Sequence, residues 1–290
     1  VSWTELSPAL IRAQMIKDKK LFKDLNLNSL RIVCTGGEPW TEKPWKWLFE
    51  FIGKSKVPIM NSAGGTEVSG SILHCCLHRP FKVGSFNAPI PGMSADILTL
   101  DGKKVSTDEM GELVMRKSSI GLTKSLWNDD DRYIKNYWSI IKDFWVHGDL
   151  ASKDKDGHWF LHGRSDDTIK VSGKRIGPSE LESVIVKSGK AKEVAAVGIP
   201  DENKGSKIIL SIVLLENSEE KESYFENLVI NDLGKSFKPD KIIFVKDLPK
   251  TRNMKIMRRV IKSCLAKEDP GDISTLLNPE SVEEIRAHAI

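Results

Sequence analysis

The sequence predicts a multidomain protein of the α/β and α+β classes, because three parts of the chain arrange their apolar residues differently. Residues 1–78 alternate helical and strand-like segments, which is typical of a parallel sheet covered by helices. Residues 79–163 contain short alternating runs broken by Pro and Gly, which predict a β-rich subdomain shaped as a distorted barrel. Residues 164–290 mix helices and strands again and predict a smaller α+β domain.

Composition is typical of a soluble globular protein. The 290 residues are enough for a substantial core, and 29% are charged while 40% are hydrophobic. The net charge of +4 is well short of the strongly basic balance of dedicated nucleic-acid-binding domains, so we expect no nucleic-acid partner. No signal peptide or apolar run of membrane-spanning length is visible, which predicts a cytoplasmic protein without a membrane span.

The cysteines fit a reducing cytoplasm. They show neither a disulfide framework nor the C-x-x-C spacing of a zinc ribbon. They are Cys34, Cys75, Cys76 and Cys264. A metal site formed by the two adjacent cysteines with His74 and His78 is an alternative, but no second ligand pair follows at a zinc-site spacing, so we favour a metal-free cluster.

The first part of the chain predicts two helices and two strands, with a polar loop after each strand. The expected helices run from Pro8 to about Lys20 and from Trp40 to Ile52, and the expected strands cover Leu30–Cys34 and Val57–Met60. The loops Gly36–Pro39 and Asn61–Glu67 follow these strands. Because ligands of parallel sheets gather at the carboxyl ends of the strands, we expect both loops to face a ligand.

The later parts predict further hairpins, helices and strands. Asp101-Gly102 indicates a hairpin turn, and Asp154–His158 indicates a plain turn before a strand at Trp159–Leu161. The expected elements of the last part are helices at Pro178–Lys187 and about Ser218–Leu233 and strands at Val194–Ile199, Lys207–Leu215 and Lys241–Val245. Asn278 is expected to cap a final helix that starts at Pro279.

The stretch Gly163–Ser183 is chemically dense. A short strand at Thr168–Val171 is followed by the turn Ser172-Gly173, and Pro178 opens a helix. A strand, a basic turn and a helix start present positive charge to an anion. The alternative is a solvated β-turn with ordinary surface charges.

This stretch resembles the linker of the AMP-forming acyl-CoA synthetases and adenylating enzymes, in which G-R-x-D/K-D precedes x-x-x-S-G-x-R-x-x-x-x-E-I/L-E. Further blocks follow the same family order, and the tail resembles that of acetyl- and propionyl-CoA synthetases. These blocks are Gly36–Pro39, Gly65–Glu67, Trp145–Ala151, Val194–Asp201, Leu248–Arg259 and the tail Gly271–Glu280. The family order favours a functional meaning over a chance match of any single block.

The resemblance implies an ATP and AMP site with bound Mg²⁺. The implied nucleotide-binding residues are Gly36, Glu38, Pro39, Gly65, Thr66, Asp149, Arg164 and Arg175. In the family the Thr matching Thr66 contacts the α-phosphate and is part of the catalytic set, while the Glu matching Glu67 holds the metal, and a hard carboxylate suits Mg²⁺. His147 stands where the family has Thr or Ser.

The resemblance also implies a mobile C-terminal domain, 164–290, that turns about Asp166. Lys255 would act at the acyl carboxylate and α-phosphate, and coenzyme A would bind at Lys170, Ser172 and Gly173. The implied reaction joins a carboxylate, ATP and coenzyme A. A basic patch at Lys246–Lys262 that binds nucleic acid is the alternative, but no aromatic platform accompanies it.

The acid is expected to be larger than acetate. In acetate-specific members of the family a tryptophan stands at the position of Gly64 and closes the acyl pocket. Glycine is expected to leave that volume open.

The chain begins at Val1 in a strand-like run, so we expect it to continue a longer protein; a natural start, proteolysis and an engineered boundary stay open. The family's Gly-, Ser- and Thr-rich phosphate loop is not in this sequence. We therefore expect the N-terminal half of the enzyme as a partner, in the same or a separate chain. The alternative is a fragment that binds nucleotide or coenzyme A without catalysis.

Overall fold

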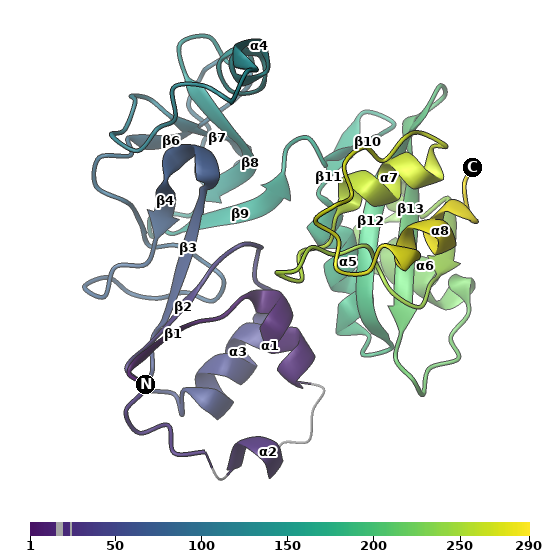
Figure 1. Cartoon of the computed structure of the whole chain (residues 1–290), viewed down its shortest axis with the longest axis horizontal. Coiled ribbons are helices and arrows are strands. Elements are labelled where there is room, and N and C mark those ends of the chain that lie inside the picture. The colour runs from purple at the N-terminus through teal and green to yellow at the C-terminus, as the bar shows by residue number, and fades with distance from the viewer. Residues whose placement is uncertain (16–19, 24) are drawn as a thin grey trace. The chain divides into compact units, whose positions relative to one another are not determined.

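The computed structural model describes residues 1–15, 20–23 and 25–290, which form two compact units (Figure 1). The first unit is Val1–Ser165 and the second is Asp166–Ile290. Each unit has its own buried core, and each is described separately.

The first unit contains a five-stranded sheet in the order β1-β2-β3-β4-β5. The first three strands are parallel, which confirms the parallel arrangement predicted from the alternation of helices and strands, and β4 and β5 are added antiparallel. The strands are β1 Trp3–Glu5, β2 Ile32–Thr35, β3 Ile59–Gly65, β4 Gly70–His74 and β5 Ala88–Pro89. The helices are α1 Pro8–Met15, α2 Lys20–Lys23, α3 Glu42–Lys46 and the π-helix η1 Trp47–Ile52.

Element ends in this sheet differ from the prediction. Helix α1 is described to Met15, and the predicted continuation toward Lys20 falls on residues outside the described ones. The predicted loop Asn61–Glu67 is wrong in its first part, because β3 continues through Gly65. The reason is a change of partner: β3 pairs in parallel with β2 up to Asn61 and in antiparallel with β4 from Ser62 onward.

The β-rich part of the first unit is a four-stranded antiparallel meander, β6-β7-β8-β9. Its elements are β6 Ala95–Leu98, β7 Gly111–Met115, α4 Asp130–Tyr133, the π-helix η3 Ile134–Trp138, β8 Trp145–Lys153 and β9 Trp159–Arg164. Every residue of β7 is buried, so both faces of the sheet are covered at this strand. The part is β-rich as predicted, but in this fully described stretch the four strands form an open sheet instead of a closed barrel.

The second unit is an α+β domain built on the three-stranded sheet β12-β13-β14 and the hairpin β10–β11. Its elements are β10 Ile169–Val171, β11 Lys174–Ile176, α5 Pro178–Lys187, β12 Ala191–Asp201, β13 Gly205–Leu214, α6 Glu222–Leu233, η4 Lys235–Phe237, β14 Lys241–Phe244, α7 Arg258–Leu265 and α8 Glu280–Arg286. Helix α5 has the predicted bounds.

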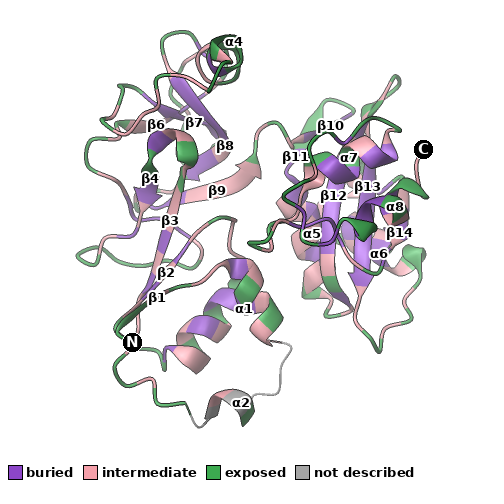
Figure 2. Cartoon of the chain, viewed as in Figure 1, coloured by how far each residue is buried: buried purple, intermediate pink, exposed green. Residues whose placement is uncertain are grey.

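Alternate residues of β12 contact helices on opposite faces of this sheet. Val194 and Ala196 belong to a core with α5 and α6, whereas Ala195 and Val197 belong to a core with α7 and α8. Figure 2 shows β12 and β13 buried along most of their length. A strand buried on both faces is a near-continuous apolar run, which is how Val194–Ile199 reads in the sequence.

Asn278 does not cap the last helix with its side chain, which corrects the prediction. Its Oδ1 accepts from the backbone N–H of Lys250 at 3.0 Å, and its Nδ2 donates to Asp247 Oδ2 at 2.7 Å and to the Leu248 carbonyl at 2.8 Å. These groups are distant in sequence, so no local pattern indicates them. Asn278 fastens the tail to the segment 247–250.

No described helix is both long enough and apolar enough to span a bilayer.

Replacing Asn278 tests this role. Asn278→Ala should lower the free energy of unfolding by about 2–3 kcal/mol, because buried partners lose their hydrogen bonds. Asn278→Ser keeps a helix-capping oxygen but lacks the amide donors, so we expect a similar loss. Urea unfolding measures both, with the exposed Asn253→Ala as control. If Asn278→Ser were as stable as the unmodified chain, the tether to segment 247–250 would be contradicted and helix capping by residue 278 would be favoured.

Candidate functional site

The carboxyl end of the parallel strands brings the two predicted loops of the first unit together. The Ser62 hydroxyl donates to the Thr35 carbonyl at 3.1 Å, and a Cβ on Gly36 would lie 2.9 Å from the Ser62 carbonyl oxygen. Only glycine lets the backbones approach this closely. The neighbouring Glu38 accepts from Arg12 of α1 at 2.7 Å, which holds Glu38 and the half-buried Pro39 beside this helix.

Thr66 and Glu67 lie just past the end of β3, in the 3₁₀ turn η2 Thr66–Val68. Thr66 is exposed. The Glu67 Oε1 accepts from the Tyr137 hydroxyl at 2.9 Å, and the Tyr137 ring stacks on Trp145 with centroids 5.2 Å apart. Burial first, and then the Glu67 carboxylate, raise the pKa of Tyr137 to about 12. Tyr137 therefore holds Glu67 in place as a neutral donor.

Strand β8 places Asp149 near the Gly65–Glu67 turn. A Cβ on Gly65 would lie 3.2 Å from His147 Cε1, so the Gly65 turn lies against the His147 ring. His147 Nε2 is 3.2 Å from Asp149 Oδ2, and His147 is 6% exposed. The predicted Thr66–Glu67 turn and the predicted Asp149 thus converge, with His147 between them.

Arg164 at the end of β9 completes this cluster. Strand β9 pairs with β8 in a register that places Arg164 opposite Asp149. Its Nη1 donates to the His147 carbonyl at 3.0 Å and lies 3.8 Å from Asp149 Oδ1. Gly148 has φ +84, a backbone conformation that favours glycine, and a Cβ there would lie 2.7 Å from Arg164 Nη2, so glycine leaves room for the guanidinium in this position.

Gly64 is exposed, but the direction in which a side chain would leave its Cα is occupied by backbone. A Cβ on Gly64 would lie 1.9 Å from the Gly70 carbonyl oxygen and 2.6 Å from Ser71 Cα. The β3–β4 ladder shifts register between Ala63 and Gly64, and this irregularity turns the Gly64 Cα hydrogen into the β4 backbone. The space is filled by main chain.

In the second unit the hairpin β10–β11 brings four predicted residues together. Ser172 (φ 48) and Gly173 (φ 80) form its two-residue turn with left-handed backbone, as hairpins of this length require. Lys170 and Arg175 are direct cross-strand partners, and both are exposed. Like charges directly opposite each other destabilise a hairpin, so the pair is suited to binding an anion.

Lys255 lies on a different hairpin of this unit. The Thr251 N–H donates to the Lys255 carbonyl at 2.9 Å, and the Met254 N–H donates to the Thr251 carbonyl at 2.8 Å. Met254 has φ +65, the left-handed position that usually carries glycine in such a loop. Lys255 is exposed.

A buried ion-pair cluster anchors the base of the Lys255 hairpin. Lys250 is 4% exposed, and its Nζ contacts Glu193 at 2.7 Å and Asp247 at 2.6 Å. Burial opposes the charge, but the hydrogen bonds to Asp247 and Glu193 outweigh it and raise the pKa of Lys250. A charged lysine with two carboxylate partners is costly to displace once buried.

Asp166 is the first residue of the second unit and lines a small cavity of about 50 Å³ together with Arg258 and Lys262. Arg258 forms a bidentate pair with Glu182, at 2.9 and 2.7 Å.

Sequence reasoning missed Tyr137 and the contacts of His147. The i, i+4 spacing of Tyr133 and Tyr137 is a local signal that could have indicated an aromatic face on a helix in 130–138. In the structure the two ring centroids lie 5.4 Å apart. The partner of Tyr137, Glu67, lies 70 residues away, so its role could not be found locally.

Comparison with known proteins identifies the family. The AMP-binding enzyme family matches residues 1–127, and the AMP-binding enzyme C-terminal domain matches residues 180–255. The chain belongs to the AMP-binding enzymes. This confirms the resemblance drawn from the sequence motifs.

Individual relatives agree. The chain is 38% identical over 286 residues to the acetyl-coenzyme A synthetase of Methanothrix thermoacetophila, with 96% of this chain and 43% of the relative covered. It is 37% identical to that of Pasteurella multocida, with 97% of this chain and 44% of the relative covered. The chain therefore spans less than half the length of these curated relatives.

Solved structures support the same fold. The acetoacetyl-CoA synthetase of Streptomyces lividans superposes with a TM-score of 0.83 at 22% identity, covering 99% of this chain and 45% of that one. An anthranilate CoA ligase solved with anthranoyl-AMP gives a TM-score of 0.76 at 25% identity, covering 90% and 49%.

The Tyr137–Glu67 hydrogen bond predicts a pH dependence. The folded pKa of about 12 lies above the unfolded value near 10, so the protonated hydroxyl stabilises the fold below pH 10, and this contribution is lost as the pH rises from about 10 to 12. A tyrosinate absorbance titration should show one of the three tyrosines ionising late, and Tyr137→Phe should remove that step. Ionisation of all three near pH 10 would contradict the hydrogen bond.

Alanine at Gly64 tests whether the space beside it is filled. Gly64→Ala should lower the free energy of unfolding by at least about 2 kcal/mol, because the methyl group meets backbone that cannot yield cheaply. Gly70→Ala is the matched control, since its Cβ would have no neighbour within 4 Å, and it should change stability by less than about 0.5 kcal/mol. Equal stability of the two variants in urea unfolding would contradict the backbone contact and favour open space beside Gly64.

Proposed function

We propose that this chain is the C-terminal part of an AMP-forming acyl-CoA synthetase. In the proposed reaction a carboxylate attacks the α-phosphate of ATP to give acyl-AMP and pyrophosphate, and the coenzyme A thiolate then displaces AMP to give acyl-CoA. The observation that carries the proposal is the convergence of Glu67, Asp149 and Arg164 at one end of the first unit. Each comes from a different sequence block.

The first unit supplies the proposed nucleotide subsite. Asp149 would accept hydrogen bonds from the ribose hydroxyls, and Arg164 opposite it would donate to the ribose. The exposed Thr66 hydroxyl would donate to the α-phosphate, while the backbone of Gly36–Pro39 and Gly65 would border the nucleotide. The 3.2 Å contact with His147 keeps the Asp149 carboxylate oriented.

Glu67 fits Mg²⁺ as a ligand. One carboxylate oxygen accepts from the neutral Tyr137 hydroxyl, which leaves the other oxygen to bind a hard cation. When bound, Mg²⁺ would neutralise phosphate charge. Tyr137 would act as a positioning residue, because it fixes the direction in which Glu67 points.

The second unit supplies two proposed surfaces that act in turn. Lys255 would stabilise the negative charge that builds on the α-phosphate and acyl oxygens during adenylation. On the β10–β11 hairpin, Lys170, Ser172 and Gly173 would bind coenzyme A, and Arg175 would lie close to the nucleotide phosphates. Rotation of the unit about Asp166 would exchange Lys255 for this hairpin between the two steps.

The proposed enzyme needs the N-terminal half that its relatives contain, in the same or a separate chain, since the chain covers 43% of the first of them. The acid is proposed to be a small carboxylate, because the relatives are acetyl-coenzyme A synthetases. The argument from Gly64 for an acid larger than acetate loses its basis, because β4 backbone fills the space beside this residue.

ATP–pyrophosphate exchange tests the proposed function. The chain alone and the chain joined to its N-terminal half should be assayed with carboxylic acids of increasing length. Exchange in the joined protein would establish the synthetase and identify its acid. Exchange in neither would contradict it and favour a fragment that binds nucleotide or coenzyme A without catalysis.

Lys255→Ala separates the two steps. In the complete enzyme it should reduce adenylation by about 100-fold or more, because a donor to the charged transition state is lost, yet spare thioester formation from supplied acyl-AMP. The exposed Lys246→Ala is the control, and it should leave both rates unchanged. Equal loss of both steps in Lys255→Ala would contradict the assigned role.

A further inference from the structure

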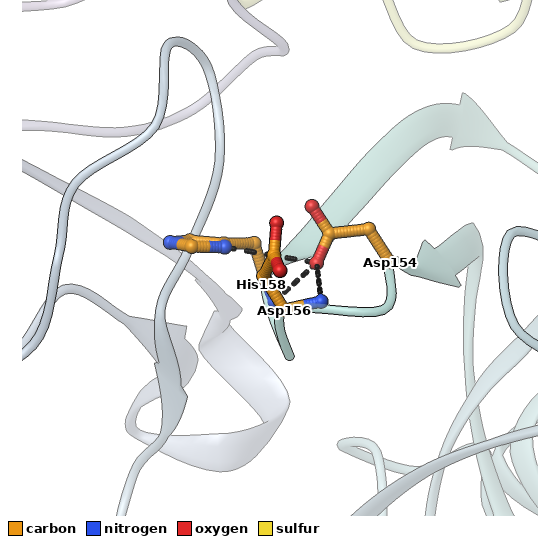
Figure 3. Close-up of side chains that lie close together, drawn as sticks. All are labelled: Asp154, Asp156 and His158. Carbon is orange, nitrogen blue, oxygen red and sulfur yellow. Dashed lines mark hydrogen bonds and ion pairs between the residues drawn. The ribbon is translucent and has the colours of Figure 1, made fainter.

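The turn between β8 and β9 gathers three groups that can bind a metal ion: Asp154, Asp156 and His158 (Figure 3). One donor atom from each residue lies within 4.8 Å of the other two, and within the described residues this is the one such group. The sequence predicted only a plain turn here. The three residues take no part in the proposed synthetase site.

The hydrogen bonding of His158 determines which ring nitrogen can bind a cation. Nε2 lies 3.1 Å from the Pro80 carbonyl oxygen. A carbonyl can only accept, so Nε2 carries the proton and Nδ1 keeps a lone pair. Histidines that bind metals commonly donate their other ring N–H to such a carbonyl, which fixes the tautomer.

His158 Nδ1 is directed at the carboxylates without a hydrogen-bond partner. The residue is 8% exposed, and Nδ1 is a buried atom with no hydrogen bond. It faces Asp154 Oδ1 at 3.6 Å, too far for a hydrogen bond. A buried polar atom in this condition costs free energy unless something satisfies it.

Asp154 is held rigidly in this arrangement. Its Oδ1 accepts from the backbone N–H groups of Asp156 at 3.0 Å and His158 at 2.8 Å, and its Oδ2 pairs with Lys82 at 2.6 Å. Two metal bonds of about 2.1 Å that meet at a tetrahedral angle separate their donors by about 3.4 Å. The 3.6 Å gap between Nδ1 and Oδ1 therefore suits a shared ion.

We propose that Asp154, Asp156 and His158 bind a divalent first-row transition ion such as Zn²⁺. One imidazole nitrogen and two carboxylate oxygens form a mixed donor set that zinc accepts, whereas Mg²⁺ and Ca²⁺ prefer oxygen alone. Lys82 offsets one of the two carboxylate charges by pairing with Asp154 Oδ2.

The ion would join three side chains of the β8–β9 turn, and two of these residues also contact the segment around Pro80, through the Pro80–His158 and Lys82–Asp154 contacts. The same two strands carry Asp149 and Arg164. The site is therefore a structural clamp for the hairpin that bears these residues.

Zinc titration of the full chain tests the proposal. Because cysteines also bind Zn²⁺, binding is read at His158 by NMR of the histidine ring nitrogens together with calorimetry. One equivalent of Zn²⁺ should shift the Nδ1 resonance of His158 and raise the midpoint of thermal unfolding. Asp156 is exposed, so Asp156→Asn should keep the fold, and it should weaken this binding about tenfold or more.

Two further variants make the outcome decisive. His158→Gln can still donate to Pro80 but offers no imidazole, and it should abolish the site. Asp101→Asn alters an acidic residue that pairs with Lys103 at another turn, and it should leave binding unchanged. An unshifted His158 Nδ1, or the same zinc affinity in Asp156→Asn and His158→Gln as in the unmodified chain, would overturn the proposal.

Discussion

The antiparallel register of β8 and β9 is the constraint on which the first unit's polar cluster depends. It places Arg164 opposite Asp149, and Gly148 leaves room for the guanidinium. A shift of one residue would turn Arg164 to the opposite face of the sheet. The register shifts between Leu150 and Ala151, so the Asp149–Arg164 pair and the Asp154–His158 turn lie on opposite sides of an irregularity in the hairpin.

In the second unit the polar hairpins project from a sheet that is buried on both faces, so their positions depend on the core of the domain. The two cores fix strands β12 to β14. Lys250 at the base of the Lys255 loop is held to this sheet by its ion pair with Glu193 of β12 and is also paired with Asp247. Asn278 adds the C-terminal tail to the same anchor. Lys255 is exposed in a loop whose base is buried and charged, so its position is fixed while its side chain stays accessible.

The sequence was sufficient for features that depend on local pattern. Alternating helices and strands predicted the parallel sheet, and Pro178 at a first helical position predicted the start of α5. It was insufficient where a contact joins distant segments. The donor to Glu67 is Tyr137, the filled space beside Gly64 follows from a register shift with β4, and the partners of Asn278 lie about 30 residues away. None of these leaves a periodic signal.

Two locally unfavourable features of the second unit lie within the segments that match family motifs. Met254 adopts a left-handed backbone that costs a residue other than glycine about 1 kcal/mol or more. Lys170 faces Arg175 across the β10–β11 hairpin, although like charges in that position repel. A sequence selected for stability alone would place glycine at the first position and an acidic residue at the second. Departures from local rules are expected where a site needs a particular shape or charge, and an anion bound at the hairpin would turn the Lys170–Arg175 repulsion into attraction.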